Sequence, residues 1–153
     1  MIHKGHSYFA GTARFLAVFF ILLGCIQFLP APKLLWQKAI GGTGYDQGMK
    51  MFLTSTNCVI LGGTSASNDK AAKGNHAIGS NDILITKVSA NGTIIWTTMI
   101  GGSGNDEFAE MVPTPDDGLI LIGTTDSQDG DAVGNHGKMD LFVAKLDKMG
   151  KVE

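Results

Sequence analysis

The chain has 153 residues, of which 44% are hydrophobic and 21 are glycine, and it carries 12 Lys and Arg against 14 Asp and Glu, a net charge of −2. Without basic clusters that alternate with aromatic residues, this mild acidity argues against nucleic acid as a partner. The many glycines, with scarcely any helix-length periodicity after residue 33, indicate short strands joined by turns.

The first 24 residues have the layout of a secretory signal peptide. Lys4 and Arg14 precede an apolar run over 15–23, which is shorter than the roughly 18–20 residues that a membrane span needs. Removal of residues 1–24, which contain no acid, leaves ten basic against 14 acidic residues, a net charge of about −4. We therefore expect the protein to be exported.

Residues 22–25, Leu-Leu-Gly-Cys, resemble a bacterial lipobox, in which the cysteine becomes the acylated N-terminus of the mature protein. We expect residues 25–33 to tether a lipoprotein to an outer or cell-surface membrane through Cys25. The alternative is a secreted or periplasmic protein without a lipid. Only Cys25 and Cys58 are present, so a lipidated Cys25 would leave Cys58 without a disulfide partner.

Residues 34–153 contain one sequence unit twice, over about 36–95 and 96–153, with the second copy incomplete. A fixed period of this size indicates a stacked or radial arrangement of one structural unit. Most equivalent positions are 60 residues apart, and those near the end of each copy are 58 apart. The repeated positions include Trp36 and Trp96, Gly41 and Gly101, Gly42 and Gly102, Asp46 and Asp106, and Asp82 and Asp140.

Each copy predicts four strands. In the first copy the expected strands are 35–40, 48–54, 58–64 and 83–88. In the second copy they are 95–100, 108–114, 118–124 and 141–146. The short apolar runs in the later strands are typical of strands that are buried on both faces.

Turn residues separate the expected strands. Asn91-Gly92 predicts a type I′ hairpin, since both residue types tolerate a positive φ, and its counterpart is 149–150. Residues 55–57 and 116–118 predict hairpins between the second and third strands of the two copies. These turns indicate that neighbouring strands run antiparallel.

The joint pattern Trp-x4-Gly-Gly-[Ser/Thr]-Gly-x-Asp, then Gly-Thr-[Ser/Thr], then an Asp before an apolar strand, resembles the seven-bladed β-propeller repeats of secreted and surface bacterial proteins, many of them lipoproteins. The resemblance covers about 34–153. It implies an all-β fold of antiparallel four-stranded blades in a partial β-propeller, because a closed propeller needs roughly four to eight blades. A compact two-sheet β-sandwich is the alternative.

The chain ends one residue short of the Trp that would open a third copy, so we expect a fragment of a longer protein. Two blades alone would leave sheet edges and apolar faces uncovered, and such surfaces pair with other chains. Further repeats or self-association are therefore expected.

Two repeated features predict a structural role. Asp46 and Asp106 are expected to accept backbone hydrogen bonds and to lock the Gly-rich turns before them, which lack the lysine of a phosphate-binding loop. Trp36 and Trp96 are expected to fill the wedge between neighbouring sheets, and a glycan-stacking surface is the alternative.

Two sets of polar loop residues are candidate ligand sites. Asp126, Asp129 and Asp131 lie close together, which predicts a solvated acidic loop or, as the alternative, a Ca²⁺ site built from oxygen ligands. His76 and His136 each occur in Gly-Asn-His, and we expect them to close loops rather than to bind metal or act in catalysis.

The sequence contains no recognisable catalytic order of residues. It favours a non-catalytic, exported repeat module, a surface scaffold that presents loops to an unknown protein or glycan, without a cofactor. The alternative is a fragment of a propeller enzyme, quinoprotein-like or glycan-active, with its catalytic residues outside this chain.

Overall fold

The computed structural model describes residues 31–153, so the expected signal peptide and Cys25 lie outside the described residues. The chain divides into two units, Met1–Leu35 and Trp36–Glu153. All regular structure that is described lies in the second unit, where Cys58 is a free, half-buried cysteine. Over residues 31–153 there is no helix of the length and apolarity that crossing a membrane requires.

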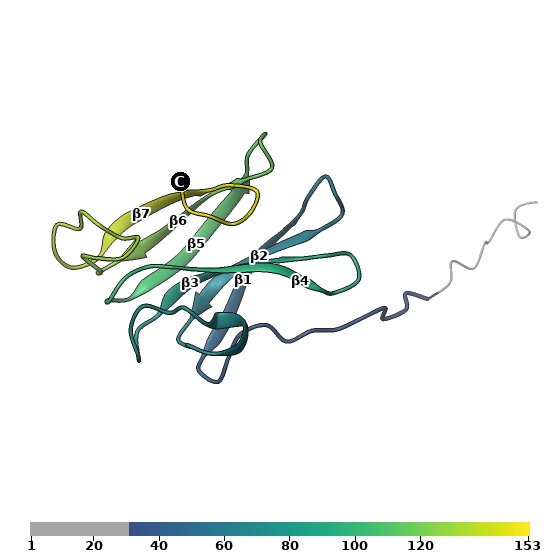
Figure 1. Ribbon diagram of the computed structural model, residues 1–153, viewed down its shortest axis with the longest axis horizontal. Helices are drawn as coiled ribbons and strands as arrows, with labels where there is room; N and C mark the ends of the chain where they lie inside the picture. Colours follow the sequence, from purple (N-terminus) through teal and green to yellow (C-terminus); the bar gives the residue numbers. More distant parts are fainter. Residues whose placement is uncertain (1–30) are drawn as a thin grey trace, which may run out of the picture. The chain divides into compact units, whose positions relative to one another are not determined.

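The second unit is all-β and consists of two antiparallel sheets (Figure 1). The first sheet has the order β1 (Asp46–Leu53), β2 (Val59–Ser65), β3 (Asp82–Val88) and β4 (Ile94–Ile100). The second sheet has the order β5 (Asp106–Pro113), β6 (Leu119–Thr125) and β7 (Asp140–Leu146). A three-residue 3-10 helix, η1 (Lys70–Ala72), lies in the loop between β2 and β3.

The first sheet crosses the boundary between the two sequence copies. The prediction of a strand over 35–40 is wrong, because residues 31–40 have an irregular backbone. The fourth place in the sheet is taken by β4, which opens the second copy and pairs with β3. The reason is local: a short hairpin folds β4 directly back onto β3, whereas 35–40 has no such neighbouring strand among the described residues.

The hairpins share one turn geometry, which is not the type I′ turn that the sequence predicts at Asn91-Gly92. That prediction is wrong because only Gly92 has a positive φ, +85°. The Gly92 amide donates to the Ser89 carbonyl oxygen (2.9 Å), which closes a four-residue turn with its left-handed residue last. The other three hairpins place a left-handed residue at the same point: Asn57, Asp117 and Gly150.

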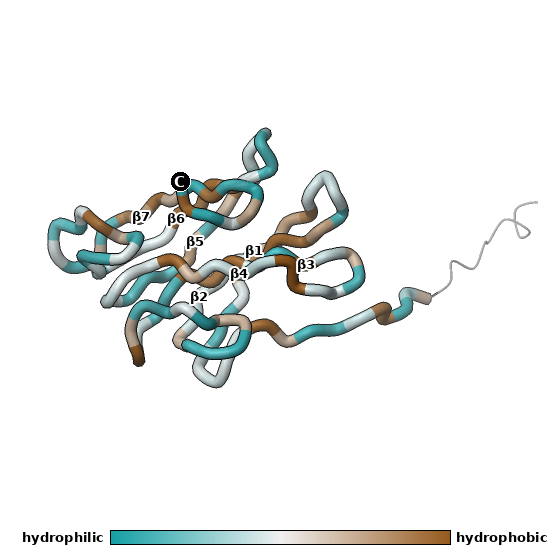
Figure 2. Tube along the Cα trace, in the orientation of Figure 1, coloured by the Kyte–Doolittle hydropathy of each residue, from teal (hydrophilic) through white to brown (hydrophobic). Residues whose placement is uncertain are grey.

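The core lies between the two sheets, where β5 packs against β1, β2 and β3. Phe108 on β5 lies over Gly62 on β2, so closely that a Cβ atom at Gly62 would be 2.7 Å from the ring. In Figure 2 the hydrophobic segments follow the strands, and the turns are mostly hydrophilic. Both sheets and the loop between β6 and β7 supply the buried residues: Ile60, Ile83, Ile85, Ile100, Phe108, Met111, Leu119, Leu121, Ala132, Phe142, Ala144 and Leu146.

Burial on both faces, expected for the last strand of each copy, holds for β3 but not for β7. All residues of β3 except Lys87 are buried. In β7, Leu141 and Val143 are 74% and 57% exposed, because only one face of the second sheet is covered among residues 31–153. The sequence pattern of the two strands is alike, so the difference comes from packing alone.

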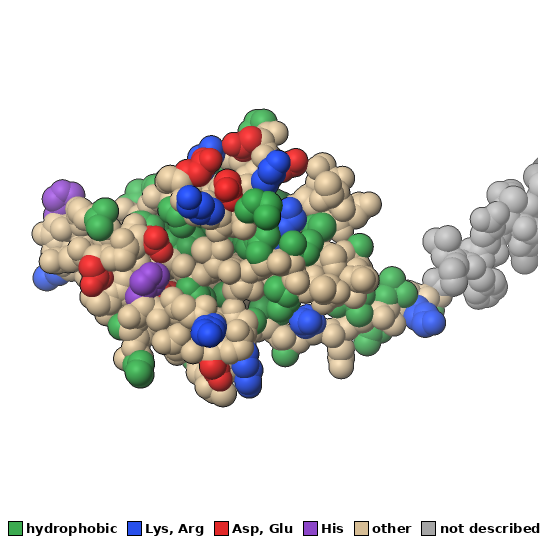
Figure 3. All heavy atoms as spheres, in the orientation of Figure 1, with side chains coloured by type: hydrophobic (Ala, Val, Ile, Leu, Met, Phe, Trp, Pro, Cys, Tyr) green, Lys and Arg blue, Asp and Glu red, His purple; other side chains and the backbone are tan. Residues whose placement is uncertain are grey.

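Charged side chains lie mainly at the surface, where Figure 3 shows both signs interleaved. Lys50 on β1 pairs with Glu110 on β5 (2.9 Å), which links the two sheets. Lys145 on β7 pairs with Asp116 (3.1 Å) and Glu153 (2.5 Å). These pairs are exposed, so each contributes little to stability.

Candidate functional site

The Gly-rich turns are each held by the aspartate that follows them. Asp106 Oδ2 accepts hydrogen bonds from the Gly102 amide and from Ser127 Oγ, both at 2.8 Å. The Asp106 side chain is fully buried, and its Oδ1 atom has no partner among the described residues. The turn and the adjoining loop are therefore joined through one carboxylate.

Asp46 makes the same contacts in the first copy. Its Oδ2 atom accepts the Gly42 amide and Ser67 Oγ, both at 2.9 Å, and Ser65 Oγ donates to Oδ1. The backbone approaches this carboxylate so closely that only glycine fits at Gly41, where φ is +140° and a Cβ atom would lie 2.3 Å from Asp46 Oδ2. The repeated Gly and Asp positions thus form one local structure.

The three aspartates considered for Ca²⁺ bind the second Gly-rich turn. Asp129 Oδ1 accepts the Ser103 amide (2.6 Å), Asp126 Oδ1 accepts the Asn105 amide (2.5 Å), and Asp131 Oδ2 accepts the Gly101 amide (3.4 Å). Within residues 31–153, no group of three or more His, Cys, Asp and Glu side chains is arranged to hold a metal ion. Each of these carboxylates therefore has a separate backbone partner.

His76 lies in an acidic cluster that spans the two copies. Its Nδ1 atom is 2.6 Å from Asp82 Oδ2, and its backbone amide donates to the same oxygen at 3.1 Å. On its other side, His76 Nε2 is 3.8 Å from Oδ2 of Asp131, in the second copy. Asp82 is fully buried and its Oδ1 atom has no partner among the described residues.

The second copy repeats the pair in an exposed setting. His136 Nδ1 is 2.9 Å from Asp140 Oδ2, and the His136 side chain is 90% exposed. Hydrogen bonds from the His136 backbone and side chain lower the pKa of Asp140. The two copies therefore place the same pair of groups in different surroundings.

These surroundings change the protonation of the first pair. Burial by itself would lower the pKa of His76, but the hydrogen bond to Asp82 and the negative charges of Asp82, Asp131 and Asp106 together raise it. Burial raises the pKa of Asp82, and the charge of Asp106 adds to this, although hydrogen bonds from His76 oppose it. Both groups thus hold protons more tightly in the folded chain.

A raised pKa contributes stability that is complete below the unfolded-state value and is lost as the pH rises through the folded-state value. We expect the unfolding temperature of the full chain to fall as the pH rises above about 6.5, the ordinary histidine pKa. Asp82→Asn removes one buried carboxylate and the main cause of the raised His76 pKa, so it should flatten this fall. Thermal unfolding between pH 6 and 8.5 measures the effect.

Asp140→Asn is the matched control for this prediction. Because the pKa of Asp140 is lowered, its contribution to stability is lost only in acid, below its ordinary value of 3.8. The control should keep the wild-type fall above pH 6.5. Equal pH profiles for wild type and Asp82→Asn would contradict the role of the buried pair.

The rings of the two tryptophans pack against hairpin turns formed by other residues. Trp36 Nε1 donates to the Ala90 carbonyl oxygen (2.9 Å), and a Cβ atom at Gly92 would be 2.9 Å from the ring. Trp96 repeats this arrangement on the turn that holds Gly150. Trp36 remains 40% exposed. Each ring therefore packs against the glycine of a turn.

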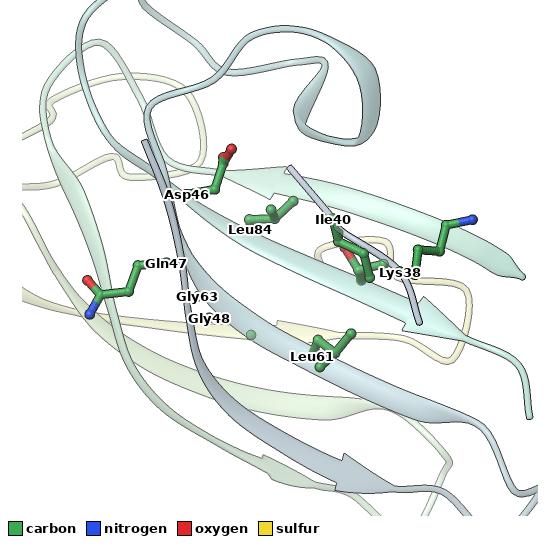
Figure 4. Close-up of a pocket in the computed structure, with 10 residues that line it drawn as sticks. Lys38, Ile40, Asp46, Gln47, Gly48, Leu61, Gly63 and Leu84 are labelled. Atoms are coloured by element: carbon green, nitrogen blue, oxygen red, sulfur yellow. The ribbon is translucent and has the colours of Figure 1, made fainter. Parts of the chain in front are cut away.

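A hollow of about 180 Å³ lies on the outward face of the first sheet, beside residues 36–40 (Figure 4). Leu61, Leu84 and Ile40 supply its apolar walls, and Gly48 and Gly63 leave space at its floor. No motif within a single copy predicts this hollow. The available signal is the substitution between copies, since the second copy has Phe108 at the place of Gly48.

No sequence pattern predicts the contact of His76 with Asp131, because loops from different copies supply the two groups. No known protein-family model matches the chain, and no similar protein was found among curated sequences. The resemblance to propeller repeats therefore remains a prediction from the motifs.

Proposed function

We propose that the chain is a non-catalytic, exported repeat module of β-propeller type that is tethered to a membrane through an acylated Cys25 and binds a glycan or a protein with its loops. The observation that carries this proposal is the use of the repeated polar residues. Asp46, Asp106 and Asp129 accept hydrogen bonds from backbone amides of the Gly-rich turns, and so do the hydroxyls of Ser67 and Ser127. Groups engaged in this way support a scaffold rather than a reaction.

The loop end of the first sheet is the surface that best suits a glycan. A shallow hollow there is lined by Thr43, Asn68, Asp69 and Ile78, and Ile78 is 96% exposed. Tyr45, which follows the Gly-rich turn, is 67% exposed. Apolar surface beside amide and carboxylate oxygens matches a sugar ring, which presents both C–H and hydroxyl groups.

The full chain is therefore expected to be retained on at least one of three insoluble glycans, cellulose, chitin and peptidoglycan. Tyr45→Ala and Ile78→Ser should each weaken retention by about ten-fold, the effect of losing about 1.4 kcal/mol of binding energy. Co-sedimentation with each glycan measures the bound fraction.

Met149→Ala is the control, since Met149 is 66% exposed on a hairpin turn at the other end of the strands. It should bind like wild type. Retention on none of the three glycans would contradict the glycan-binding part of the proposal, and equal loss in all three variants would contradict the location.

A further inference from the structure

The outward face of the second sheet keeps the apolar pattern of a buried face. Val112, Ile122, Leu141 and Val143 are between 38% and 74% exposed. Their counterparts in the first copy are Phe52, Gly62, Ile83 and Ile85, on the face that packs against the second sheet. Residues that are buried or partly buried in the first copy thus have apolar, uncovered equivalents in the second.

The outward face of the first sheet is the other half of this interface. It carries Gly48, Met51, Leu61 and Leu84, which line or adjoin the hollow described above. Their counterparts in the second copy are the residues that meet the first sheet: Phe108, Met111, Leu121 and Phe142. The two outward faces therefore correspond to the two sides of the contact within the chain.

Large and small side chains are exchanged between these two contacts. Inside the chain, Phe108 fills the space over Gly62. At the equivalent contact between two outward faces, Ile122 would meet Gly48. The space is present, since a Cβ atom at Gly48 would meet nothing within 4 Å and Gly48 lines the hollow. In the second contact Ile122 takes the place of Gly62, and Gly48 takes the place of Phe108. The large residue therefore changes sides, but each contact still joins one large residue and one glycine.

In a second pair of contacts, the large residue stays on the same side of the interface. Ile83 lies against Gly123 inside the chain, where a Cβ atom at Gly123 would be 2.9 Å from Ile83 Cδ1. The equivalent pair between outward faces is Leu141 and Gly63, again a large aliphatic residue against glycine. Leu141 is now 74% exposed, and Gly63 lines the hollow.

The charges also match. Lys50 and Glu110 occupy equivalent positions, and they pair with each other inside the chain at 2.9 Å. When the outward faces meet in the same way, Glu110 of one copy approaches Lys50 of the next. Lys50 of β1 and Glu110 of β5 therefore alternate from one sheet to the next, so that each charge faces one of opposite sign.

The backbone offers a further complementary pair. Residues 36–40 are the counterparts of residues 96–100 in β4, and Trp36 rests on the first sheet's hairpin as Trp96 rests on the second sheet's. In β4 these residues pair with β3, whose counterpart is β7. Among the described residues, no strand pairs with 36–40, and the free side of β7 has only the Leu146–Val152 bridge. An open strand edge and an unpaired extended segment can join in this way.

We propose that a second copy of this chain covers each outward face: the second sheet of one copy docks on the first sheet of the next, head to tail, with Ile122 in the Gly48 hollow. The contact is heterologous, so repeating it produces a closed ring or an open filament. Docking does not depend on the glycan-binding proposal. The ring size does rest on the propeller type, since about four to eight sheets correspond to about two to four copies.

Cross-linking of the full chain in cells tests the docking. Gly48→Cys and Ile122→Cys, each in a Cys58→Ser background, are expressed separately and together, and the cells are treated with a mild oxidant. The expected result is a disulfide-linked dimer only when both variants are co-expressed. A third variant, Met149→Cys, replaces Ile122→Cys as the control and should give no dimer with Gly48→Cys.

Sedimentation velocity of the purified full chain provides the second measurement. Wild type should sediment as a species of more than one copy, and Ile122→Asp should raise the dissociation constant by about ten-fold or more, because a carboxylate would be buried without a partner. Val133→Asp, at a loop residue that is 75% exposed, should associate like wild type. A monomer at all concentrations, or a dimer formed by either single cysteine variant alone, would overturn the proposal.

Discussion

Phe108→Ala is expected to lower the free energy of unfolding by about 3–5 kcal/mol, the usual cost of deleting a buried aromatic ring. Phe108 is 3% exposed and lies between the two sheets over Gly62. The cavity cannot close easily, because a glycine backbone on the facing strand has no side chain that could move into it. Denaturant unfolding of the full chain, followed by circular dichroism, measures the loss.

Ile95→Ala is the control for this prediction. Ile95 lies in β4 but is 51% exposed, so its truncation should cost less than about 1 kcal/mol. If both variants were equally stable, the contact between the sheets would not be the main source of stability. A loss confined to Phe108→Ala would support the contact between the sheets as a main source of stability.

Asp106→Ala is expected to cost about 2–4 kcal/mol, since it leaves two buried donors without an acceptor and each such group costs about 1–3 kcal/mol. The donors are the Gly102 amide and Ser127 Oγ. The Asp106 Oδ1 atom has no partner among the described residues, so removing the carboxylate also relieves one unfavourable group and keeps the loss below the sum of both donors. Denaturant unfolding measures the total.

Hydrogen exchange shows whether this loss is local. In Asp106→Ala, the amide of Gly102 should exchange faster than in wild type even under conditions that strongly favour folding. Asp116→Ala is the control, because Asp116 is 56% exposed and pairs with Lys145 at the surface. It should leave exchange at Gly102 unchanged, and a similar increase in both variants would contradict a specific role for Asp106.

Much of the fold could be predicted from local sequence. Seven of the eight expected strands occur, because each combines a short apolar run with turn residues at both ends. The failure at 35–40 has a physical reason: a strand needs a hydrogen-bonding partner, and composition cannot show whether one is beside it. The type I′ turn predicted at Asn91-Gly92 does not form, because only Gly92 has a positive φ.

The contacts of the candidate site also divide into local ones that the sequence predicts and contacts between copies that it does not. The contacts of Asp46 and Asp106 with the Gly-rich turns are local, and the repeated spacing indicated them. The approach of Asp131 to His76 depends on how one copy packs on the other, which no local pattern contains. Differences between the copies, such as Gly48 against Phe108, carried information about packing that the similarities did not.

The position of β4 has a consequence for folding cooperativity. Most of its residues, 96–100, belong by sequence to the second copy, yet they complete the sheet of the first. A break between the copies would therefore remove the fourth strand of the first sheet and leave β3 unpaired on that side. The smallest cooperative unit is consequently larger than one repeat. The folding of one copy is coupled to that of the next because the first sheet contains a strand from the second copy.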